Sequence, residues 1–174
     1  GTDASGTGSI PNGRDGVRLD TNSSRNMIGG TALGAGNLIA HNTGRGVAIG
    51  SNGAIRNSIL SNSIADDGSL GIDLGIDGVT ANDPGDGDTG PNTLLNFPVI
   101  YSVTISGGNV TIIGECRPGA TVEFFKAAAD PTGYGEGQTF IGSAVEGSGA
   151  DSNGAVGTID PTANQFTFTF AVGS

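Results

Sequence analysis

Three aspartates in a glycine-rich tract are the residues of this sequence best suited to bind a metal ion. Asp83, Asp86 and Asp88 lie among glycine, asparagine and proline residues between positions 76 and 96. Ca²⁺ takes about six to eight oxygen ligands, and flexible acidic loops of this kind supply them. Residues 86–90 imitate part of a calcium loop, although the glutamate that ends an EF-hand loop is missing. The tract therefore predicts a calcium site that stiffens a joint between modules; the alternative is that the aspartates only form turns.

A second group of carboxylates, Asp66, Asp67 and Asp73, would suit chemistry on a polysaccharide. A glycoside hydrolase needs two positioned carboxylates, and a lyase needs Ca²⁺ together with a base that removes a proton. The candidate bases are the arginines of this half of the chain, Arg18, Arg45 and Arg56. Both tyrosines lie in the other half, so no aromatic platform for a sugar is near these acids. We expect the protein not to be an enzyme.

The single histidine and the single cysteine indicate no further chemistry. His41 has no serine or cysteine partner at a recognisable spacing, so it does not point to nucleophilic catalysis. Cys116 alone cannot form an intramolecular disulfide, and one cysteine with one histidine cannot complete a zinc site.

Composition limits the partners of the chain. Its 174 residues carry a formal net charge of −10, from 17 acidic and 7 basic residues. Without a basic patch the chain is not expected to bind nucleic acid, and no apolar run is long enough for a membrane span. Its 33 glycines, its many asparagines and threonines and the near absence of lysine are typical of secreted bacterial β-proteins. We expect an extracellular or cell-surface location.

An internal repeat in residues 1–75 predicts the elements that would position these groups. The motif Gly-x-x-Leu/Ile begins at Gly16, Gly46 and Gly71, so that successive copies are 30 and then 25 residues apart. Two further lines of the repeat place an asparagine two residues before an isoleucine, at Asn26 and Asn57 and at Asn37 and Asn62. Three short strands per repeat at this period indicate stacked coils, with the asparagines forming short ladders at the corners.

Each coil should alternate inward and outward side chains. The strands are expected at residues 17–19, 27–28, 38–40, 47–49, 58–60, 63–65 and 72–74. The inward residues that stack on neighbouring coils would be Val17, Leu19, Val47, Ile49, Ile72 and Leu74. Arg18, Ala48 and Asp73 would then face outward on one wall.

After Pro98 the pattern changes to longer alternating strands. They are expected at residues 99–106, 109–114, 121–126, 138–145 and 165–172. The alternation of Phe166, Phe168 and Phe170 with threonines marks a half-buried strand. We predict an all-β chain, with a short parallel β-helix and acidic linker in residues 1–95 and an immunoglobulin-like antiparallel β-sandwich in residues 96–174.

Motifs along almost the whole chain carry a family resemblance. They are GTDASGT at 1–7, NMIGGT at 26–31, AGNLI at 35–39, GIDLG at 71–75, NDPGDGDTGPN at 82–92, NFPV at 96–99, VEFF at 122–125 and GEGQTFIGS at 135–143. The chain resembles the secreted bacterial right-handed parallel β-helix proteins, of pectate-lyase-like repeat, in which an immunoglobulin-like module follows the helix. The resemblance implies a surface or secreted protein with an adhesive or structural role, mostly without assigned activity.

The chain departs from that family in two ways. It has two and a fraction coils where such proteins normally have many. In similar modules the strand that corresponds to residues 166–170 is followed by a further strand, which has no counterpart before Ser174. We therefore expect the sandwich to be one strand short, and an open sandwich exposes edges that can pair with another chain.

These features predict a structural protein that assembles with copies of itself. We expect head-to-tail contacts that build a filament or surface fibre through the open coil and through strand complementation, with residues 1–10 as the donor strand. One alternative is a fragment of a large adhesin or stalk that binds glycans or another cell. The second alternative is a polysaccharide-active β-helix enzyme.

Overall fold

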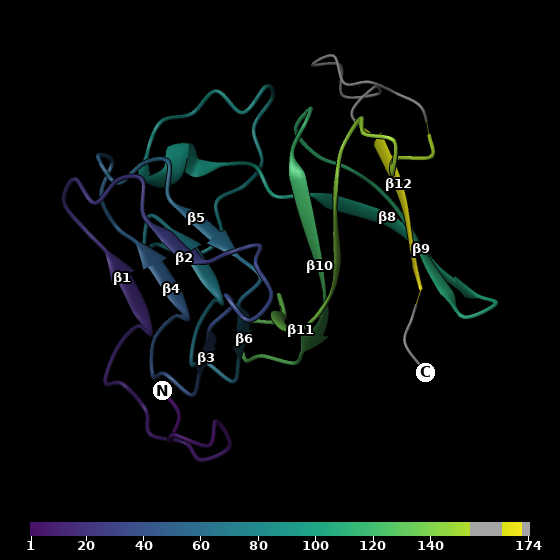
Figure 1. Ribbon diagram of the computed structural model, residues 1–174. Helices are drawn as coiled ribbons and strands as arrows, with labels where there is room; N and C mark the ends of the chain where they lie inside the picture. Colours follow the sequence, from purple (N-terminus) through teal and green to yellow (C-terminus); the bar gives the residue numbers. More distant parts are fainter. Residues whose placement is uncertain (154–164, 172–174) are drawn as a thin grey trace. The chain divides into compact units, whose positions relative to one another are not determined.

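The computed structural model describes residues 1–153 and 165–171, and within them the protein is nearly all-β (Figure 1). Its regular structure in these residues consists of twelve strands and one 3₁₀ turn, η1 (Pro91–Leu94). The predicted all-β class is confirmed. Within the same residues, no helical segment has the length and apolar character needed to cross a membrane.

Seven strands of three residues form three parallel sheets in the first half of the chain. The strands are β1 (Val17–Leu19), β2 (Met27–Gly29), β3 (Leu38–Ala40), β4 (Val47–Ile49), β5 (Ser58–Leu60), β6 (Ser63–Ala65) and β7 (Ile72–Leu74). The sheets have the strand orders β1-β4-β7, β2-β5 and β3-β6. The chain therefore visits three sheets in turn and then returns to the first, which is the arrangement that the repeat predicts.

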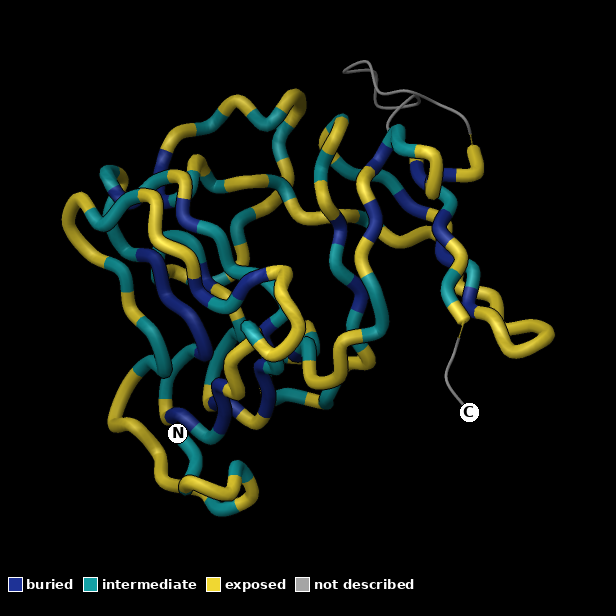
Figure 2. The backbone as a smooth tube through the Cα atoms, viewed as in Figure 1, coloured by how far each residue is buried: buried dark blue, intermediate teal, exposed yellow. Residues whose placement is uncertain are grey.

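The register between repeats also follows the sequence. Val17 pairs with Val47, which pairs with Ile72, and on the same strands Leu19, Ile49 and Leu74 form a second row. Strand β4, in the middle of its sheet, is buried throughout (Figure 2). Among the strands of the parallel sheets β4 alone has a paired neighbour on both sides, and each of its three residues is 0% exposed. Four further isoleucines pack with it from the other two sheets, Ile28, Ile39, Ile59 and Ile64.

The prediction that Ala48 and Asp73 face solvent is wrong. Both are buried, with 0% and 1% of their surface exposed, whereas Arg18 in the same row is exposed. For Asp73 the cause is Arg45, whose guanidinium pairs with the carboxylate at 2.8 Å and also donates to the carbonyl of Ile76. The backbone N–H groups of Ile76 and Gly78, in the segment after β7, donate to the same carboxylate and help to enclose it.

Ile72 is more exposed than the sequence predicts. The sequence predicts it as an inward stacking residue, and it does keep the register, but 45% of its surface is exposed. Strand β7 has a neighbour on one side only, so its first side chain lacks the cover that β4 receives from two strands.

Five longer strands form two sheets in the second half. They are β8 (Val99–Ser106), β9 (Asn109–Glu115), β10 (Thr121–Ala128), β11 (Glu136–Val145) and β12 (Gln165–Ala171). Strands β8, β9 and β12 form an antiparallel sheet in the order β12-β9-β8, while β10 and β11 pair with each other. The predicted strand positions agree with these bounds to within two residues.

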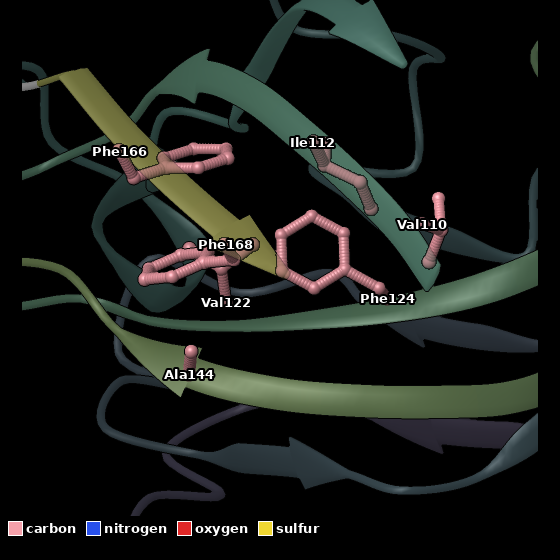
Figure 3. Close-up of a cluster of buried hydrophobic side chains, with 7 residues drawn as sticks. All are labelled: Val110, Ile112, Val122, Phe124, Ala144, Phe166 and Phe168. Carbon is pink, nitrogen blue, oxygen red and sulfur yellow. The ribbon is translucent and has the colours of Figure 1, made fainter. Parts of the chain in front are cut away.

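An aromatic cluster forms the core of these sheets (Figure 3). Phe166 and Phe168 of β12 are almost fully buried, and the ring of Phe124 meets each of them edge-on at 5.8 Å between centroids. Val110, Ile112, Val122 and Ala144 complete the buried part of the cluster. The alternation predicted for the last strand is therefore observed, with Phe170 partly buried at its end.

The chain forms two compact units that interleave along the sequence. The first unit comprises Gly1–Ala81, Gly87–Leu95 and Phe125–Phe140. The second comprises Asn82–Asp86, Asn96–Phe124 and the described residues from Ile141 onward. The connection between β10 and β11 thus belongs to the unit of the parallel sheets.

Candidate functional site: polar ladders and an open strand

The acidic tract is held by hydrogen bonds within the protein. The carboxylate of Asp86 pairs with Arg117 at 2.8 Å and accepts the backbone N–H of Asn96 at 2.8 Å. Asp83 exchanges two further hydrogen bonds with Asn96 through its own backbone, whereas Asp88 belongs to the other unit. Among the described residues no three acidic, histidine or cysteine side chains converge as metal ligands. Calcium binding by Asp83, Asp86 and Asp88 stays a prediction.

The carboxylates considered for polysaccharide chemistry lie in different surroundings. Asp66 is exposed, while Asp67 and Asp73 are 2% and 1% exposed. Asp73 accepts hydrogen bonds from Arg45 and from the backbone N–H groups of Ile76 and Gly78. Acids so enclosed are not placed to flank a sugar.

The arginines considered as catalytic bases are either held in ion pairs with aspartates or exposed at a corner of the stack. Arg45 bridges Asp73 and Asp15, and Arg18 bridges Asp15 and Asp20. Hydrogen bonding to Asp20 raises the pKa of Arg18, which is the opposite of what a proton acceptor needs. Arg56 lies exposed at a corner where its φ is +61°.

His41 and Cys116 take structural positions. His41 occupies a corner after β3 with a φ of +57°. Burial, followed by the nearby charges of Glu146 and Asp151, raises the pKa of the Cys116 thiol to about 12. A thiol with this pKa is almost wholly protonated at neutral pH and reacts slowly.

Asparagine ladders join the repeats at their corners. Asn57 accepts hydrogen bonds from the backbone and side-chain N–H groups of Asn26 at 3.0 and 2.9 Å, and Asn62 does the same for Asn37 at 3.0 and 2.9 Å. These are the two ladders that the repeat predicts. The sequence does not reveal that Asn92, after the acidic tract, continues the first ladder by accepting the N–H of Asn57 at 2.8 Å.

A third ladder of hydrogen-bonded polar side chains was not predicted from the sequence. Asn12 donates to Asn42 at 2.9 Å, Asn42 donates twice to Asp67 at 2.8 Å, and the Asp67 N–H donates to the carboxylate of Glu136 at 3.2 Å. Asn12, Asn42 and Asp67 are 30 and 25 residues apart, the same intervals as the glycine marks, so this spacing was available as a signal. Glu136 is the first residue of β11, and no repeat spacing in the sequence links it to this ladder.

The last rung of the third ladder is a buried pair of carboxyl groups. Glu136 is 3% exposed, and burial, aided by the charge of Asp67, raises its pKa to about 7. Burial also raises the pKa of Asp67, although its hydrogen bonds from Asn42 oppose the shift. The Oδ2 atom of Asp67 is buried without a hydrogen-bond partner in the described residues. The pair therefore holds unfavourable charge at neutral pH.

Removing a ladder rung tests how much these hydrogen bonds stabilise the stack. Asn62→Ala is expected to lower the free energy of unfolding by about 2–3 kcal/mol, because it leaves the two Asn37 donors and the Ile28 carbonyl without their partner. Asn37→Ala removes an exposed rung and is the matched control with a smaller effect. Urea unfolding followed by circular dichroism compares them; equal losses would contradict a stabilising ladder.

The first repeat has exposed edges. Its strands β1, β2 and β3 each have one paired neighbour, and Met27 and Leu38 on them are 68% and 48% exposed. At the other end of the stack, Asn92 and Glu136 cover the rungs of Asn57 and Asp67. The two ends of the stack are therefore chemically different.

Residues 1–10, predicted as a donor strand, form a closed loop on the first unit. Thr2 and Ser9 make an antiparallel bridge, and the N–H of Ile10 donates to the carbonyl of Gly1 at 2.8 Å. The amino group of Gly1 in turn donates to Asn42. This segment would have to leave these contacts before it completes another subunit's sandwich.

Strand β8 carries the most open apolar face of the second unit. Facing residues of its antiparallel sheet form three rows on one side, Ile100–Gly114–Phe166, Val103–Ile112–Phe168 and Ile105–Val110–Phe170. The β12 residues of these rows, together with Val110 and Ile112 of β9, pack in the core. By contrast, Ile100, Val103 and Ile105 are 53%, 56% and 72% exposed. The apolar face of the sheet thus continues beyond the part that is covered.

Comparison of the chain with protein-family models, with curated proteins and with solved structures gives no match. The family resemblance therefore remains a prediction from the sequence motifs.

Proposed function

We propose that this chain is a non-enzymatic, extracellular structural protein that assembles with copies of itself by pairing exposed strands. In this proposal the parallel sheets are a short right-handed β-helix, and the five longer strands are an immunoglobulin-like sandwich. The uncovered apolar face of β8 carries the proposal. A sheet edge with an exposed apolar face is a template for pairing with another chain.

A second exposed surface supports assembly beyond a pair. The edges of β1, β2 and β3 lie in the other compact unit, so each copy offers two different surfaces for pairing. Two such surfaces on one molecule allow copies to add in a row, as in a filament. Because residues 1–10 are engaged in their own loop, strand edges support assembly better than donation of this segment.

Enzymatic and calcium-dependent roles have weaker support. The acids that a polysaccharide enzyme would use are buried or paired with arginine, and the acidic tract uses Asp86 in an ion pair. The extracellular location is supported by composition, since the chain has one lysine and 33 glycines.

Sedimentation velocity over a wide range of concentration tests the proposed function. We expect monomer at a few micromolar and larger species at several hundred micromolar, with elongated particles visible by negative-stain electron microscopy. A uniformly monomeric protein at every concentration, at low and high salt and with or without Ca²⁺, would contradict self-assembly.

A further inference from the structure

We infer that the partner of strand β8 is the β8 strand of a second copy, paired antiparallel about a two-fold axis at Thr104. This inference rests on the proposed function and specifies the surface, the partner and the register. It is carried by the sequence of β8, by its exposure and by its place at the edge of the sheet.

The edge of β8 lacks most of the features that keep an edge strand from pairing with another chain. Residues 99–106 contain no charged residue and no proline, whereas native edges usually carry lysine, proline or an inward charge. One irregularity is present: the register with β9 shifts between Ile100 and Ser102. A bulge of this kind interrupts pairing, so the regular part of the edge runs from Ser102 to Ser106.

The regular part is complementary to itself. Antiparallel pairing about Thr104 places Thr104 opposite its own copy, Val103 opposite Ile105, and Ser102 opposite Ser106. Each pair then lies on one face, because side chains alternate along both strands. The exposed apolar residues would pair with apolar residues, and hydroxyl residues would pair with hydroxyl residues.

Charge also favours a contact at this strand. Two copies with a formal net charge of −10 each repel one another, so they approach best along a strip that carries no charge. Salt screens this repulsion and should strengthen the contact, whereas an interface built from ion pairs would weaken in salt.

The contact is expected to be weak. A single pair of short strands buries less than the roughly 1,200 Å² of the smallest stable specific interfaces. We therefore expect a dissociation constant on the order of 10–100 μM for this contact, within the range of sedimentation experiments.

Substitution of an exposed β8 residue tests the surface. Ile105→Lys should weaken dimerisation at least tenfold, because it places a charge in each of the two apolar pairs. Since Ile105 is 72% exposed, the melting temperature should be unchanged. Tyr134→Lys, at a residue 70% exposed in the other unit, is the matched control and should dimerise like the native protein. Association in Ile105→Lys equal to that of the control would overturn the inference while leaving self-assembly itself in place.

Disulfide trapping tests the register. Thr104→Cys should form a cross-linked dimer on mild oxidation, because paired Cα atoms lie about 4.5–5.5 Å apart, within reach of a disulfide. Ser102→Cys, on the same strand and also exposed, pairs with position 106 and should cross-link much more slowly. The native Cys116 contributes little background because its pKa is about 12.

The outcomes separate the two proposals. Fast cross-linking at 104, and its loss when Ile105→Lys is added, would support the two-fold pair. Equal rates at 102 and 104, or cross-linking that persists with Ile105→Lys, would overturn it. A native protein that is monomeric under all conditions would overturn the proposed function as well.

Discussion

Asp73→Ala is expected to lower the free energy of unfolding by about 3–5 kcal/mol, among the largest effects of any single substitution in the first unit. The side chain is fully buried and accepts a hydrogen bond from Arg45 at 2.8 Å and from the backbone N–H groups of Ile76 and Gly78. Its removal leaves these donors without their acceptor in a place that water reaches poorly. Chemical unfolding at neutral pH measures the loss.

Asp20→Ala is the control for this prediction. Asp20 also pairs with an arginine, Arg18, at 2.6 Å, but half of its side chain is exposed. Exposed ion pairs contribute little to stability because water solvates the separated charges. We expect little change for Asp20→Ala. A loss for Asp73→Ala no larger than that for Asp20→Ala would show that the buried network does not hold the wall of the stack.

Glu136→Gln is expected to stabilise the protein at neutral pH by up to about 3 kcal/mol. The Glu136 carboxyl has a pKa of about 7 in the folded protein against 4.5 as the ordinary value, and each unit corresponds to about 1.4 kcal/mol. A carboxyl with a raised pKa is most favourable below its unfolded value, so native stability should fall as the pH rises from about 4.5 to about 7. Glutamine removes the charge, keeps an acceptor for the Asp67 N–H and offers a donor to the unpaired Oδ2 of Asp67.

The pH dependence of stability tests whether the buried carboxyl pair of Asp67 and Glu136 destabilises the protein at neutral pH. The native protein should lose stability between pH 4.5 and 7, while Glu136→Gln should keep only the smaller slope due to Asp67, whose pKa is also raised. Hydrogen exchange of peptides that cover residues 64–70 and 130–140 locates the effect. Asp66→Asn, at an exposed neighbouring acid, should retain the native slope. An identical slope in the native protein and Glu136→Gln would refute the role of this carboxyl.

The strands were predictable because each repeat marks its own position. Glycine at 16, 46 and 71 and an asparagine two residues before isoleucine fix where each short strand starts, and the recurrence of each mark after 25 to 31 residues fixes which strands pair. The alternation of Phe166 and Phe168 with threonine similarly identifies the buried side of β12. In both cases the sequence pattern is local, so it can be recognised without knowledge of the rest of the fold.

The features that the sequence predicted wrongly or not at all depend on contacts between segments far apart in the chain. Alternation assigns Asp73 to solvent, and only the position of Arg45, 28 residues earlier, shows that the wall is covered. Glu136 meets Asp67 across 69 residues, and no periodicity links them. The exposure of Ile105 is likewise invisible in a sequence that alternates correctly, because it depends on which strand faces β8.

The ladders also give the stack a direction. Beyond the Asn12–Asn42 rung, which joins two side chains, the backbone N–H of the earlier residue donates to a side-chain oxygen of the later one, from Asn26 to Asn57 to Asn92 and from Asn42 to Asp67 to Glu136. The residue that closes such a ladder must therefore be an acceptor, and both Asn92 and Glu136 are. Lysine or arginine, which only donate, are excluded from these two closing positions, whereas the amide of glutamine remains compatible with them.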